Sequence, residues 1–170
     1  MTGGPPPDPF ANGLPGRIDP DVDLRVPPER AELSGRRGAA VLAVISAGGA
    51  AGASARYAIS LAWPSGGGFP WSTLGVNVLG SALIGVLMVL IGAGGRWAHP
   101  LVRPFAGVGV LGGFTTFSAY ALETHGLLEQ GRLGLALLYA SGTAAGCVAA
   151  VWLAVSLTRA ALGPGSRART

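Results

Sequence analysis

Long uncharged, apolar runs separated by short polar breaks make up most of this chain. Between residues 39 and 158, no charged residue interrupts 39–55, 57–95, 104–122 or 133–158. About 20 apolar residues in a helix are enough to cross the roughly 30 Å hydrocarbon core of a bilayer. The second run is divided by Pro64, Pro70 and the glycines between them, which break a helix. The pattern therefore predicts four membrane spans, at about 39–63, 71–94, 101–126 and 133–158.

We expect all four spans to be α-helices, because hydrocarbon offers no water to unpaired backbone groups. A membrane β-barrel would show alternating apolar and polar positions, and these runs are continuously apolar. The predicted fold is therefore all-α, a four-span transmembrane helical bundle over 39–158, and the predicted location is the cell membrane, with several passes. Four closely spaced spans leave no room for a soluble catalytic domain, so we expect no enzyme.

The two ends of the chain differ in composition from the membrane region. Residues 1–38 hold eight prolines, six acidic residues and five arginines, with few large apolar side chains. Such a composition cannot offset the conformational entropy that is lost on folding. We therefore expect a disordered Pro-rich N-terminal tail at 1–38. Residues 159–170 form a short basic C-terminal tail.

Charge and cysteine content narrow the function further. Only 12% of the 170 residues are charged, about half of the roughly 25% that is typical of a soluble domain. All 12 basic residues are arginines and most of them flank apolar runs, as topology determinants do, so we expect no nucleic-acid partner. Because Cys147 is the one cysteine, a disulfide or a cysteine metal cluster within one chain is excluded.

The middle of the third span is unusual. It reads Gly-Gly-Phe-Thr-Thr-Phe-Ser over 112–118, and adjacent glycines followed by β-branched residues favour a continuous helix poorly. We expect a broken third helix, whose freed carbonyls at membrane depth would favour a cation. The alternative is a continuous helix with a glycine-rich packing face.

Polar residues inside the spans suggest a path for a solute. Asn77 lies well inside the second span, and Tyr139, Thr143 and Cys147 recur at every fourth residue of the fourth, on one helix face. In hydrocarbon such groups find partners or line a wet path. Alternatively, Thr143 bonds a carbonyl of the preceding turn and Cys147 is a small apolar residue. No span holds a deeply placed acid, which favours a passive conduit.

Three motifs identify a family that this chain resembles. They are GGAAGASARY at 48–57, TLGVNVLGS at 73–81, and GGFTTFS at 112–118 followed by Glu123; a weaker match is GRLGLAL at 131–137. In these motifs the chain resembles the CrcB/Fluc family of fluoride channels, over about residues 40–158. The resemblance implies a passive, fluoride-specific ion channel that exports cytoplasmic fluoride and reduces its toxicity. It also implies an antiparallel dimer of four-span subunits.

The resemblance also assigns roles to individual residues. It implies one structural sodium ion, not transported, held at the dimer centre by the backbone carbonyls of Gly112 and Thr115 of each subunit. The implied fluoride path is lined by Asn77, Phe117, Ser118, Tyr120, Tyr139 and Thr143. Such a path offers several weak donors and positive ring edges in place of a trapping charge. The family usually has Phe where this chain has Tyr120.

The partner and the activity leave alternatives open. Seven arginines lie at span ends on the N-terminal side of the membrane and two on the other: Arg36, Arg37, Arg96, Arg103, Arg159, Arg167 and Arg169 against Arg56 and Arg132. Since arginine asymmetry sets orientation, our hypothesis is that the second subunit is an oppositely biased paralogue rather than a copy of this chain. One alternative function is a small proton-coupled four-span exporter, although 39–55 holds no carboxylate. Another is a non-conducting partner subunit of a heterodimeric fluoride channel, with Tyr120 as its sign.

Overall fold

The computed structural model describes residues 35–64, 68–93 and 99–163, and its regular elements in these ranges are all helices. Four helices are long and apolar enough to cross a membrane: Gly38–Ala62, Trp71–Gly92, Arg103–Glu129 and Leu133–Leu162. The prediction of an all-α fold with four membrane-length helices is confirmed. Most of the predicted N-terminal tail and the end of the C-terminal tail lie outside the described residues.

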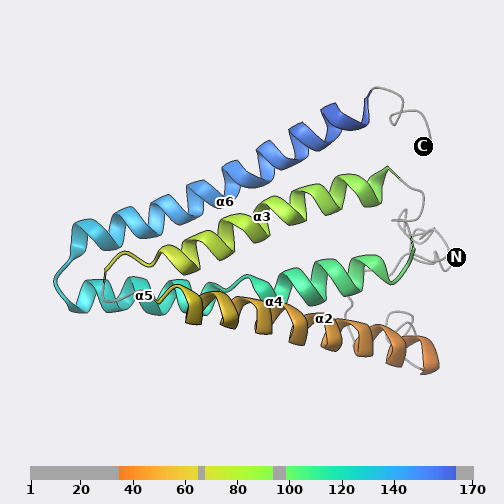
Figure 1. Cartoon of the computed structure of the whole chain (residues 1–170), viewed down its shortest axis with the longest axis horizontal. Coiled ribbons are helices and arrows are strands. Elements are labelled where there is room, and N and C mark those ends of the chain that lie inside the picture. The colour runs from red at the N-terminus through yellow and green to blue at the C-terminus, as the bar shows by residue number, and fades with distance from the viewer. Residues whose placement is uncertain (1–34, 65–67, 94–98, 164–170) are drawn as a thin grey trace, which may run out of the picture.

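The four spans lie side by side along the length of the bundle (Figure 1). Helix α2 (Gly35–Ala62) packs mainly on the third span, and α3 (Trp71–Gly92) packs mainly on α6 (Leu133–Leu162). The third span comprises a π-helix, η2 (Arg103–Leu111), then a short α4 (Gly112–Phe114) and α5 (Phe117–Glu129). The beginning of α2 and the end of α6 lie at the same end of the bundle (Figure 1).

Glycines bring α2 and the third span into backbone contact. A Cβ atom added to Gly109 would lie 2.8 Å from the Ile45 carbonyl oxygen. One added to Gly52 or Gly113 would press still closer on the facing backbone. Small residues allow such close approach where no hydrophobic force drives helices together. These glycines therefore fix where the third span lies against α2.

Two residues in extended conformation separate α4 from α5. Thr115 has φ −76° and ψ 158°, and Thr116 has φ −149° and ψ 123°. The Leu111 carbonyl accepts both the Thr115 amide at 3.0 Å and the Thr115 hydroxyl at 2.9 Å. On the other side, the Thr116 hydroxyl caps α5 by accepting the Ala119 amide. The chain thus passes from one helix to the next with side chains replacing part of the helical hydrogen bonding.

Few large side chains in the described part of the chain are buried. Leu127, Ala136 and Tyr139 form the core at one end of the bundle, and Tyr139 is fully buried. Many large apolar side chains on all four spans are exposed, including Phe117 at 78% and Trp152 at 67%. Such exposure is expected where lipid or a second subunit covers the surface.

Candidate functional site

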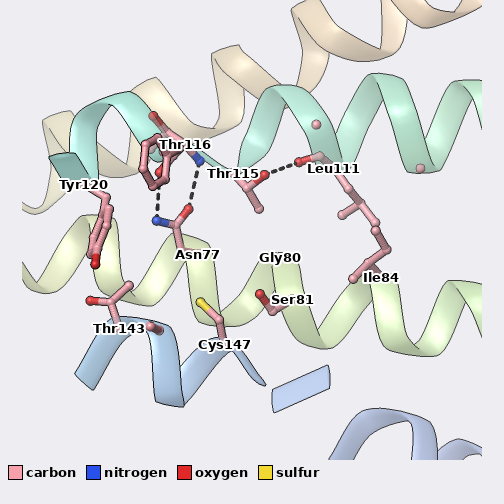
Figure 2. A pocket seen from close by; sticks show the side chains of 14 residues that line it. Asn77, Gly80, Ser81, Ile84, Leu111, Thr115, Thr116, Tyr120, Thr143 and Cys147 are labelled. Carbon is pink, nitrogen blue, oxygen red and sulfur yellow. Dashed lines mark hydrogen bonds between the residues drawn. The ribbon is translucent and has the colours of Figure 1, made fainter. Parts of the chain in front are cut away.

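A cavity of about 480 Å³ lies between α3, the middle of the third span and α6 (Figure 2). Four of the predicted pore residues and both predicted cation ligands line it: Asn77, Phe117, Tyr120, Thr143, Gly112 and Thr115. Ser81 and Cys147 also line it, and none of the described residues that line it is charged. Of the other two predicted pore residues, Ser118 is exposed and Tyr139 is fully buried, and neither lines the cavity.

Asn77 is bonded to the extended backbone of Thr116 at both of its polar atoms (Figure 2). Its Nδ2 donates to the Thr116 carbonyl at 2.9 Å, and its Oδ1 accepts the Thr116 amide at 2.8 Å. Because an amide nitrogen carries two hydrogens, one donor hydrogen of Asn77 is left over from this pair of bonds. The sequence predicted that Asn77 needs partners, but it did not indicate which backbone groups they are.

The Gly113 carbonyl, which follows the predicted cation ligand Gly112 in the chain, accepts a hydrogen bond from an arginine. Arg56 Nε on α2 donates to the Gly113 carbonyl at 3.3 Å, and the Arg56 side chain is partly buried. A guanidinium in a membrane segment normally reaches the interface or finds such an acceptor. The bond adds a second tie between α2 and α4, beside the glycine contacts.

Thr143 differs from the other described threonines in the hydrogen bonding of its hydroxyl. Its side chain is 4% exposed, and its hydroxyl has no hydrogen-bond partner among the described residues. The alternative interpretation, that this hydroxyl bonds a carbonyl of the preceding turn, is therefore wrong. By contrast, the hydroxyls of Thr115, Thr124, Ser141 and Thr158 each donate to a carbonyl four residues earlier. Thr143 thus holds a buried donor at the edge of the cavity.

The Tyr120 hydroxyl, unlike that of Thr143, has a hydrogen-bond partner in the protein. The hydroxyl donates to the Ala140 carbonyl on α6 at 3.1 Å. The Tyr120 ring lies between two other rings, with centroids 5.7 Å from Phe117 and 5.6 Å from Tyr139. The position therefore contributes an aromatic ring to the cavity wall, while its extra oxygen ties α5 to α6.

Glu123 holds a cluster that the residue pattern alone did not reveal. Its two carboxylate oxygens accept the Tyr139 hydroxyl at 2.6 Å and the Thr73 hydroxyl at 2.8 Å. The cluster links α5 to α6 and α3, and it engages the hydroxyl that was predicted to line the path. Thr73 and Glu123 both belong to the family motifs quoted above, and this was the sequence signal that could have pointed to them. That their side chains bond to each other becomes apparent only from the fold.

Comparison with known proteins gives one family. The family described as CrcB-like protein, Camphor Resistance (CrcB), matches residues 43–155. A fluoride-specific ion channel FluC 1 of Streptomyces coelicolor is 54% identical over 128 residues, covering 75% of this chain and 82% of the relative. A fluoride-specific ion channel FluC 2 of Streptomyces avermitilis is 49% identical over 127 residues, covering 74% and 78%. A fluoride-specific ion channel FluC of Novosphingobium aromaticivorans is 43% identical over 122 residues, covering 69% and 94%.

Proposed function

Because this chain belongs to the CrcB-like protein family and is a multi-pass membrane protein, we propose that it is a subunit of a passive fluoride channel. Cytoplasmic fluoride would leave through it, which reduces fluoride toxicity. The names of the relatives support this proposal. The observation that carries it in this chain is the cavity, whose wall, within residues 35–64, 68–93 and 99–163, has hydroxyl, amide and aromatic groups but no charged side chain.

The groups around the cavity suit a small, strongly hydrated anion. Fluoride must lose water before it enters an apolar space, and donors in the wall must replace that water. The second Asn77 amide hydrogen, the Thr143 hydroxyl and the edge of the Phe117 ring are the groups we assign to this task. Because the described cavity wall carries no fixed positive charge, it would bind fluoride weakly enough for the ion to leave again. A negative cell interior then drives fluoride outward by about 2.3 kcal/mol per 100 mV.

A second subunit in antiparallel orientation would complete the path. The Phe117 and Leu122 side chains on α5 are 78% and 72% exposed in the single chain. Both lie on the helix that follows the extended residues, where the proposed partner would cover them. In the single chain, the cavity wall is formed by α3, α6 and the third span. The third span of the proposed partner would complete this wall.

A structural sodium ion, not transported, fits the chemistry of the site. Sodium is a hard cation that takes oxygen ligands, as calcium and magnesium do. Among the described residues, no group of three His, Cys, Asp or Glu side chains is placed to hold a metal. The carbonyls of Gly112 and Thr115 would hold the ion, because the backbone is extended at Thr115 and Thr116 and carbonyls there lack the regular helical pattern. When bound, the ion would balance carbonyl dipoles that converge from two subunits.

The arginine distribution bears on which chain the partner is. At one end of the described bundle lie Arg36, Arg37, Arg103 and Arg159; at the other, Arg56 and Arg132 are accompanied by Glu123 and Glu129. This asymmetry favours one orientation, with the N-terminus inside. The second subunit would then be an oppositely oriented paralogue rather than this chain itself.

The two alternative functions have less support. A proton-coupled exporter needs a titratable group at its substrate site, and α2 holds no carboxylate over Gly35–Ala62. A non-conducting subunit was suggested by the extra hydroxyl of Tyr120. That hydroxyl donates to the Ala140 carbonyl, so it does not place an additional donor in the fluoride path.

Efflux from liposomes tests the proposal. The purified chain is reconstituted alone and together with the oppositely oriented paralogue that we propose as its companion. Fluoride release is followed with a fluoride electrode in the absence of a proton gradient. We expect fluoride release without chloride release in at least one of the two preparations. Proton-coupled exchange of another solute, without fluoride release from either preparation, would contradict the proposal and support the exporter.

A further inference from the structure

Two backbone amides of the third span, which in a continuous helix would donate to backbone carbonyls, donate to side-chain oxygens instead. In an α-helix each carbonyl accepts the amide four residues later, so Gly112 would pair with Thr116, and Thr115 with Ala119. Instead the Thr116 amide donates to Asn77 Oδ1 at 2.8 Å, and the Ala119 amide donates to the Thr116 hydroxyl at 3.2 Å. The two carbonyls deprived of their helical donors belong to the same two residues that are proposed to hold the cation.

We propose that Asn77 and Thr116 are positioning residues for that cation. Each withdraws one amide, and each thereby leaves one carbonyl oxygen free to face a metal ion. The inference rests on the proposed function, since it assumes a sodium ion at Gly112 and Thr115. It gives the Asn77 side chain a role in the ion site in addition to its place in the fluoride path.

The neighbouring carbonyls support this selection. The Gly113 carbonyl is occupied by Arg56 Nε at 3.3 Å, and the Thr116 carbonyl by Asn77 Nδ2 at 2.9 Å. Buried carbonyls need partners, and these two already have them from side chains. Gly112 and Thr115 thus keep their oxygens, while the carbonyl that follows each of them is bonded to protein.

The arrangement also connects the two proposed sites. Asn77 lines the cavity, and through the Thr116 amide it determines whether the Gly112 carbonyl is free. Groups that orient metal ligands in this indirect manner typically change metal affinity by about 10–100-fold when they are removed. Loss of either side chain should therefore weaken sodium binding, even though neither contacts the ion.

Four substitutions separate this role from folding. Thr116→Val keeps the side-chain shape and removes the acceptor for the Ala119 amide, whereas Thr116→Ser restores it. Asn77→Leu removes the acceptor for the Thr116 amide. Thr124→Val is the matched control, because the Thr124 hydroxyl lies on the same helix and donates to the Tyr120 carbonyl at 2.7 Å, away from the site.

The measurement is sodium affinity of the purified channel, with any companion that it requires, after exchange into a buffer without sodium. Sodium chloride is titrated in, and binding is followed by calorimetry and by the rise in melting temperature, which depends on ligand concentration and affinity. We expect Thr116→Val and Asn77→Leu to weaken sodium binding by about 10–100-fold. Thr116→Ser and Thr124→Val should keep the wild-type affinity.

Undiminished sodium affinity in Thr116→Val and Asn77→Leu would overturn the inference, and so would an equal loss in Thr116→Ser and Thr116→Val. Wild-type protein that conducts fluoride but binds no sodium would also overturn it, while leaving the fluoride channel intact. Wild-type protein that binds sodium but conducts no fluoride would refute the proposed function without touching this inference.

Discussion

The unpartnered hydroxyl of Thr143 predicts a substitution that stabilises the protein and impairs transport. Thr143→Val removes the oxygen and keeps the shape of a side chain that is only 4% exposed. In the described structure this oxygen has no partner. If it is kept for fluoride, its removal should help folding and harm permeation, a combination that ordinary core damage does not produce.

The expected magnitudes follow from hydrogen-bond energetics. A buried polar group without a partner costs about 1–3 kcal/mol, and hydrogen bonds between membrane helices average about 0.6 kcal/mol, so we expect a value toward the lower end. We therefore expect Thr143→Val to raise the free energy of unfolding by about 0.5–2 kcal/mol. A hydrogen bond to a charged group contributes about 1.5–3 kcal/mol, so fluoride flux should fall on the order of 10- to 100-fold.

Two measurements on the same preparations test this pair of effects. Thermal unfolding of the purified channel gives the stability, and fluoride release from liposomes gives the flux. Thr158→Val is the control on the same helix, because the Thr158 hydroxyl donates to the Ala154 carbonyl at 2.6 Å; it should keep its flux and gain no stability. Wild-type flux in Thr143→Val, or a loss of stability there, would refute the reasoning.

Three further predictions concern other contacts. Asn77→Asp places a carboxylate in the anion path, so fluoride efflux should be abolished while the protein still elutes as the assembled channel; unchanged efflux would exclude Asn77 from the path. Tyr120→Phe loses the bond to Ala140, worth about 0.5–1.5 kcal/mol, and should still conduct fluoride; a marked rise in flux would instead support the impaired-subunit alternative. Gly52→Ala drives a Cβ into the Val110 carbonyl and should cost about 1–3 kcal/mol in thermal unfolding, whereas Gly49→Ala, whose Cβ meets open space, should not.

Hydropathy was sufficient to predict the number and type of the spans, because a membrane helix must be long and continuously apolar. The hydrogen-bond pattern within the third span was not predictable in the same way. The π-helix over Arg103–Leu111 has no signal in the apolar pattern.

Side-chain partners were the least predictable part of the site. Asn77 was expected to need partners, yet the choice of the Thr116 backbone depends on where α3 meets the third span. Tyr139 and Thr143 share one face of α6, but of these two hydroxyls Glu123 accepts only that of Tyr139. Helical spacing indicates which residues face the same way, and it does not distinguish a hydroxyl that is bonded from one that is free.

The reversal potential of the current through the reconstituted channel tests the central claim most directly. Opposed fluoride and chloride gradients are set across a planar bilayer that holds this chain with any companion it requires. The account predicts a current whose reversal potential follows the fluoride gradient, by about 59 mV for each tenfold change in a monovalent ion. A reversal potential that follows chloride, or no current with any companion, would contradict it.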